Sequence, residues 1–195
     1  MLSETLTTIV DLLNHYISPS HTDAPLILAN ISRVNDGDEF AQSMADKLVL
    51  SVVNIEEDRV ARSPEHYVID NSVVRYKNPA IHLNITLLFA ATHDYATALP
   101  LLEKIIRFFQ IKNAFTPANT PELAAINETS QINIERVIFD WVNLNLEQVH
   151  QLWTTLGGHY MPSVVFKMRM LTIDENAIQR EGLPIKKIES QYNQI

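Results

Sequence analysis

The stretch at residues 145–173, NLEQVHQLWTTLGGHYMPSVVFKMRMLTI, holds the signals for a helix, a turn and a long strand in direct succession. Asn145 and Gln148 have the spacing of a capping box at a helix start, and Gly157 suits the left-handed position after a helix end. From Val164 onward, apolar and charged residues alternate with the two-residue period of a strand. The stretch therefore predicts a helix after Asn145, a stop at Gly157 and a strand over residues 164–173.

The apolar stripe of this helix is expected to anchor it on the sheet, and one apolar face of the strand is expected to point into the core. The helix stripe consists of Leu146, Val149, Leu152, Trp153 and Leu156. The inward face of the strand consists of Val164, Phe166, Met168 and Met170. Lys167 and Arg169 fall on the opposite face of the strand, which predicts that they point outward.

The same periodicities predict two more helices. The first covers residues 3–17, with Ser3 as its N-cap. The second pattern covers residues 92–111 and contains Pro100. Either this helix starts at Thr97, which places Pro100 in the first turn, or it is kinked at the proline. We favour the later start.

Four further strands are predicted at residues 26–31, 47–55, 81–91 and 131–141. Residues 47–55 are apolar on nearly both faces, which is typical of a central strand covered on each side. Residues 81–91 alternate and predict one buried face. The apolar residues of 131–141 change parity, which a β-bulge near Arg136 would explain.

Three segments give weaker signals. Residues 33–46 contain Asn-Asp-Gly-Asp and predict a surface loop. Residues 60–78 fit either a hairpin or an excursion away from the sheet. Residues 115–121 contain two prolines, which favour a rigid connector over a helix or a central strand.

Together these elements predict an α+β fold in a single domain at residues 1–174. The domain would contain a mixed, largely antiparallel sheet packed with about three α-helices. A doubly wound nucleotide-binding fold fits the order of elements less well. Residues 175–195 are polar and are expected to form a C-terminal tail.

Composition excludes several classes of function. The 195 residues carry a net charge of −8, which disfavours nucleic acid and anionic membrane surfaces as partners. There is no cysteine, so disulfides and thiolate chemistry are absent. No apolar run has the length of about 20 residues that a membrane span requires. We therefore expect a protein made in the cytoplasm.

No catalytic, cofactor-binding or metal-binding residues are predicted. The four glycines form no phosphate-binding loop, and the seven histidines form no ligand pair with metal-binding spacing. His93 and Asp94, combined with the acidic residues at 56–58, leave a small hydrolase as the weakest alternative. Trp141, Trp153 and Tyr160 suit either core packing or a subunit interface, where aromatic residues are enriched.

Four segments of the chain resemble the cap, or tube-terminator, proteins of contractile injection systems of the antifeeding-prophage type. They are KLVLSVVNIEEDR at residues 47–59, NPAIHLN at 78–84 with LLFAA at 87–91, IIRFFQ at 105–110 with FTPANTP at 115–121, and the opening stretch. The similarity extends over residues 1–174. It implies the phage tail-terminator fold and a non-enzymatic assembly protein.

On this resemblance, we expect a ring, hexameric in the family, that seats on the distal end of the inner tube and sheath and stops their growth. Its partners would be other copies of the chain and the tube and sheath proteins, and it would end as part of the particle. An adaptor or baseplate-associated role in the same particle is the alternative. The expected contact surfaces are the tail and two groups of residues: Asn54, Glu56, Glu57, Asp58 and Arg59, and Tyr160, Met161, Pro162 and Ser163.

Overall fold

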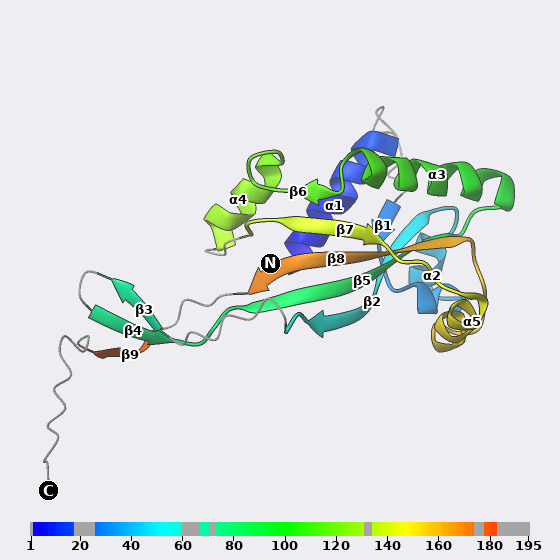
Figure 1. Cartoon of the computed structure of the whole chain (residues 1–195). Helices are drawn as coiled ribbons and strands as arrows, with labels where there is room; N and C mark the ends of the chain where they lie inside the picture. The colour runs from blue at the N-terminus through cyan, green and yellow to red at the C-terminus, as the bar shows by residue number, and fades with distance from the viewer. Residues whose placement is uncertain are drawn as a thin grey trace, which may run out of the picture.

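The computed structural model describes residues 2–17, 26–59, 67–70, 73–130, 134–173 and 178–182. Its centre is a six-stranded sheet in the order β1-β2-β5-β8-β7-β6 (Figure 1). The strands are β1 (Leu26–Leu28), β2 (Leu48–Glu57), β5 (Ile81–Ala91), β6 (Ala114–Phe115), β7 (Val137–Trp141) and β8 (Ser163–Ile173). Only the β1–β2 pair is parallel, so the predicted mixed, largely antiparallel sheet is confirmed.

Five α-helices are described, where the sequence predicted about three. They are α1 (Leu2–Ile17), α2 (Glu39–Ser43), α3 (Tyr95–Ile111), α4 (Pro121–Ser130) and α5 (Leu146–Thr155), with a 3-10 turn, η1, at Ile31–Arg33. Helices α1, α3 and α4 pack on one face of the sheet, while α5 lies on the other (Figure 1). The result is an α+β fold with helices on both faces.

A second, three-stranded sheet lies apart from the helices (Figure 1). It consists of β3 (Tyr67–Asp70), β4 (Val73–Lys77) and β9 (Ile178–Gly182), in the order β3-β4-β9. The hairpin alternative for residues 60–78 is confirmed by the antiparallel β3–β4 pair. Strand β9 belongs to the segment expected to form a tail, of which residues 178–182 are the described part.

The main core lies between the sheet and helices α1, α3 and α4. At its centre the Phe89 ring contacts the rings of Phe109 and Phe166, each at 5.8 Å between centroids. Phe109 also stacks on Phe139 at 4.5 Å. A smaller cluster under α5 includes Val49, Leu88, Val165 and Trp153. The inner ends of β2, β5 and β8 are therefore covered on both faces, whereas residues 81–91 were expected to have one buried face.

Several predicted boundaries were wrong for local reasons. Helix α1 already includes Ser3, so this residue is not the N-cap. Helix α3 starts at Tyr95 instead of Thr97 and contains Pro100 in its interior. Pro100 and Ala96, whose carbonyl the proline leaves without a helical donor, are both exposed, so water can solvate that carbonyl.

The expected surface loop at residues 33–46 contains α2, because the Asp38 carboxylate accepts a hydrogen bond from the Ala41 N–H at the N-cap. The expected connector at residues 115–121 ends where α4 begins, with Pro121 at its first position, the one place where a helix readily accepts proline. Both helices were missed in the sequence.

Strands β1, β2 and β7 also differ from their predicted limits. β1 ends at Leu28, and Ile31 begins the 3-10 turn. β2 continues through Glu56 and Glu57, which were expected to follow it, and only its first half is buried on both faces. β7 begins at Val137, so the parity change marks the start of the strand and the proposed bulge near Arg136 was wrong.

The unit at residues 145–173 folds as predicted in most respects. Asn145 and Gln148 form a complete capping box at the start of α5. At its end, the Gly157 N–H donates to Thr154 and the Gly158 N–H to Trp153, which is the Schellman arrangement, with Gly157 at φ 104°. Leu146 is the exception: it lies in the predicted stripe and is exposed.

Candidate assembly interface

The first predicted contact surface is the outer half of β2, residues 52–57, together with Asp58 and Arg59. On the side away from β5, β1 pairs with β2 only along Leu48–Leu50. Beyond this point no strand of the described ranges lies on that side of β2 (Figure 1). Within the described ranges, the outer half of β2 therefore lies at the edge of the sheet.

Side chains on this edge are exposed and mixed in chemistry. Asn54, Glu56 and Glu57 are exposed, and Ile55 between them is 48% exposed. The Asn54 amide turns back on its own strand, accepting from the Ile55 N–H at 2.9 Å and donating to Glu56 at 2.8 Å. An exposed isoleucine that is followed by two acidic residues is more typical of a contact surface than of an edge that only repels other strands.

On the face of the sheet that carries α5, the part beyond this helix is polar and carries ion pairs across strands. Lys167 of β8 lies 3.3 Å from Glu56 of β2. Arg169 pairs with Asp140 of β7. Both pairs are partly solvent-exposed, so each contributes little to folding. Lys167 and Arg169 point away from the main core, as predicted.

The second predicted surface is the turn at residues 160–163, which leads into β8. The Tyr160 ring is 60% exposed and meets Trp153 edge-on at 5.9 Å between centroids. The Pro162 carbonyl accepts from the Ala91 N–H at 3.0 Å, which fixes the turn to the end of β5. Met161 and Ser163 are half-buried. Only Tyr160 of this group offers a large exposed side chain.

The two predicted surfaces lie at opposite ends of the sheet. Ser163 pairs with Ala90, near the start of β2, whereas Glu57 at the end of β2 pairs with Leu83. About eight residues of strand separate these ends, or roughly 26 Å at about 3.3 Å per residue. The two groups cannot form one patch on a single copy, although they could contact two different neighbours.

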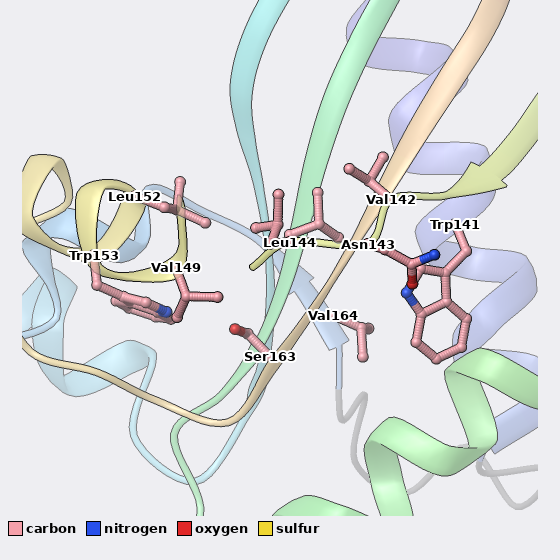
Figure 2. A pocket seen from close by; sticks show the side chains of 10 residues that line it. Trp141, Val142, Asn143, Leu144, Val149, Leu152, Trp153, Ser163 and Val164 are labelled. Carbon is pink, nitrogen blue, oxygen red and sulfur yellow. The ribbon is translucent and has the colours of Figure 1, made fainter. Parts of the chain in front are cut away.

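A third surface lies around Trp141, a residue for which the sequence left both core packing and a subunit interface open. Trp141 ends β7 and is 49% exposed. It lines two shallow cavities: one of about 260 Å³ beside α5, shown in Figure 2, and one of about 450 Å³ beside the end of α3. The apolar alternation of the sequence stops after Trp141, where the chain leaves the sheet. This was the sequence signal for the exposure of Trp141.

Inside the first cavity the side chains are mostly apolar. Leu144, Val149 and Leu152 line it, with the hydroxyl of Ser163 on the opposite wall (Figure 2). No acid–base pair is present among its lining residues. Its chemistry therefore favours the contact of apolar side chains over a reaction.

The residues of the hydrolase alternative do not come together as a site. His93 and Asp94 precede α3, where Asp94 is the N-cap residue but makes no side-chain cap bond. The acidic residues lie at the other end of the sheet, because Ala91 pairs with Leu48 and Leu83 with Glu57. Within the described ranges, no cluster of three metal-ligating side chains occurs.

The clearest electrostatic effect lies outside these surfaces, at the start of α2. The backbone N–H of Ala41 and then the charge of Arg33 lower the pKa of Asp38. Since its folded pKa is depressed, Asp38 stabilises the fold above its unfolded pKa, and this contribution is lost as the pH falls through the folded value. The shift reflects helix capping.

Among the described helices, none has both the length and the apolar character needed to cross a membrane.

With this geometry established, the class of fold can be compared with known structures. The chain aligns over its full length with a solved structure described as the sheath/tube terminator of an extracellular contractile injection system, PVC, in the extended state, at a TM-score of 0.60 and 15% identity. It aligns over 98% of its length with the anti-feeding prophage cap, a tube-terminating cap, at a TM-score of 0.56 and 13% identity. The fold is thus that of tube-terminating caps.

Residues 4–187 match the family model described as the Pvc16 N-terminal domain, and the chain belongs to this family. The match includes β9, beyond the predicted domain limit at residue 174. The chain covers 64% and 62% of the two solved chains, so both are longer. A search of curated proteins found no match.

Proposed function

We propose that this protein is a structural assembly component that forms a ring on the distal end of the tube and sheath of a contractile injection system and stops their growth. The ring is expected to contain six copies. The protein carries out no chemical reaction and becomes part of the extracellular particle. The observation that carries the proposal is the structural match of 100% and 98% of this chain to two terminating caps, together with family membership over residues 4–187.

The distribution of surfaces supports this role. A subunit in a ring needs contacts to two neighbours and to the structure beneath it. The chain offers a strand edge along β2 at one end of the sheet, and an exposed aromatic turn at Tyr160 beside an apolar surface at Trp141 at the other end. Separate surfaces of this kind are what heterologous contacts require.

The oligomeric state tests the ring directly. Native mass spectrometry of the purified protein should give a closed oligomer, with six copies expected, and negative-stain images should show rings. A strict monomer at every concentration up to that of assembly reactions would contradict the ring.

Binding to particle ends tests the capping role. Added to growing tubes and sheaths, the protein should limit their length and, when gold-labelled, should be found at the end distal to the baseplate. Label at the baseplate end would support an adaptor role in its place. Unchanged tube length with no end-bound label would contradict the proposal.

A further inference from the structure

One loop of the chain places a glycine directly after an aspartate. Asp36 and Gly37 lie between the 3-10 turn η1 and helix α2, and both are exposed. Gly37 adopts the left-handed conformation at φ 73°, and a Cβ placed on it would have no heavy atom within 4 Å. Elsewhere in the sequence, no aspartate or asparagine precedes a glycine. The pair therefore differs from every other acid or amide of the chain.

The main-chain nitrogen of Gly37 is unrestrained. Among the described residues, none accepts a hydrogen bond from the Gly37 N–H. Because glycine has no side chain and a wide range of backbone conformations, its nitrogen can approach the carboxyl carbon of the residue before it. The helices and strands of the fold hold most other amides in hydrogen bonds, which prevents such an approach. The backbone here therefore meets the steric requirement for attack on the Asp36 side chain.

We propose that Asp36 is a site of spontaneous isomerisation to isoaspartate. The Gly37 nitrogen bonds to the side-chain carboxyl carbon of Asp36. One water molecule leaves, made of a carboxyl oxygen, its proton and the amide proton. A second water molecule then opens the five-membered succinimide. Opening at the original main-chain carbonyl routes the chain through the former side chain, which adds a methylene to the main chain and leaves the mass unchanged. This modification is independent of the proposed ring.

Arg33 restrains the reacting carboxylate in the folded protein. Its Nε donates to the Asp36 Oδ2 at 3.1 Å. The same guanidinium pairs with Asp38 and lies over the Phe40 ring, at 4.5 Å from its centroid. These contacts hold the carboxylate of Asp36 toward Arg33. Both partners are exposed, so the pair is weak and opens readily. The ion pair therefore slows the isomerisation without preventing it.

The isomerisation would disturb the start of α2. On one side of the reacting pair, the Asp36 N–H donates to the Arg33 carbonyl at 3.1 Å. On the other side, the Asp38 carboxylate caps α2 by accepting from the Ala41 N–H at 2.8 Å. An added methylene changes the spacing between these two anchors. Met44 directly follows α2 and is fully buried in the cluster under α5, so a loosened α2 weakens this cluster.

Peptide mapping of aged protein tests the site. Trypsin cuts after Arg33 and Lys47 and releases residues 34–47 as one peptide. This peptide carries three aspartates, Asp36, Asp38 and Asp46. The purified protein is kept at neutral pH and physiological temperature for several weeks. Electron-transfer fragmentation, which distinguishes isoaspartate from aspartate, is then compared with that of a fresh sample. Isoaspartate should accumulate at Asp36 alone. No accumulation there, or equal accumulation at all three positions, would overturn the proposal.

Two variants separate the chemistry from the restraint. Asp36→Glu keeps a carboxylate, but attack by the Gly37 nitrogen would close a six-membered ring, which forms much more slowly. Its peptide should stay unchanged on ageing, and isomerisation at the wild-type rate would contradict the succinimide route. Arg33→Gln removes the ion pair and should raise the initial rate several-fold. An unchanged or lower rate in Arg33→Gln would show that the ion pair does not restrain Asp36.

Urea unfolding measures the consequence for α2. Wild type and Asp36→Glu are aged in parallel and unfolded as purified chains. The wild type should develop a second population with a lower urea midpoint, in proportion to its isoaspartate content, and Asp36→Glu should not. If isomerised wild type unfolds at the midpoint of fresh protein, the link between Asp36 and α2 is wrong. None of these readouts depends on whether the chain forms a ring.

Discussion

The inner and outer halves of the six-stranded sheet use the same strands for different purposes. In the inner half, residues 48–51 of β2 and 87–91 of β5 are buried. In the outer half, residues 54–57 of β2 are exposed, and of residues 81–86 in β5 only Asn84 and Ile85 are buried. Helix α5 covers one end of the sheet only (Figure 1). A continuous strand therefore belongs to the core at one end and is largely exposed at the other.

The largest expected difference between the halves is the cost of truncating a side chain. Phe89 is fully buried between Phe109 and Phe166. Phe89→Ala should lower the free energy of unfolding by about 3–5 kcal/mol, because it leaves a cavity. Ile55→Ala, in the outer half, should change it by less than about 0.5 kcal/mol. Urea denaturation of both variants at concentrations too low for assembly measures this. Equal losses would contradict the comparison.

The boundary between the halves is held by Ser51, which gives the next largest effect. Its buried hydroxyl donates to the Ala29 carbonyl and accepts from the Ile31 N–H at 3.0 Å, where β1 leaves the sheet. Ser51→Ala leaves both backbone groups without this partner and should cost about 1–3 kcal/mol.

Ser43→Ala is the matched control for this boundary. It removes an exposed hydroxyl whose bond to Phe40 water can replace, so it should stay within about 0.5 kcal/mol. If the two serine variants unfold at the same urea concentration, Ser51 does not hold the boundary.

A smaller loss of stability is expected at the start of α5, the helix that covers one face of the inner half. Asn145→Ala removes the capping box and should cost about 1 kcal/mol. Asn145→Ser keeps a capping oxygen and should retain most of the stability. Thermal unfolding followed by circular dichroism distinguishes the two. A serine variant as unstable as the alanine variant would show that the cap hydrogen bond is not the cause.

The elements that could be predicted from the sequence are those whose signals are local. The capping box of α5 involves residues three apart, and the alternation of β5 and β8 follows from side-chain direction alone. Both were predicted nearly to the residue. Local signals indicated the α+β class, and the resemblance to tube terminators added the particular fold within it.

The missed features depend on contacts distant in sequence. Ile134 is buried although it precedes β7, because its backbone N–H and C=O both pair with the Asn127 amide of α4. Its apolar side chain, out of parity with those of β7, suggested a longer strand with a bulge. Helix α4 has only one fully buried apolar residue within its described part, Leu123, so its periodicity was too weak to detect.

The predicted contact residues show the same division. The exposed residues of β2 could be named from the sequence because an acidic run follows an apolar one. That they form an open edge could not, since β1 had to end at Leu28 for the edge to exist. Trp141 remained ambiguous because its exposure depends on β6 pairing only with the first part of β7.

The smallest expected effect concerns the ion pair between Glu56 and Lys167 on the outer half. Because both groups are partly in water, a double-mutant cycle with Glu56→Gln and Lys167→Met should give a coupling below about 1 kcal/mol in the unassembled protein. The coupling should fall further at about 1 M salt, where screening acts within about 3 Å. A coupling of several kcal/mol would mean that the outer half is already shielded from solvent and would remove the distinction between the halves.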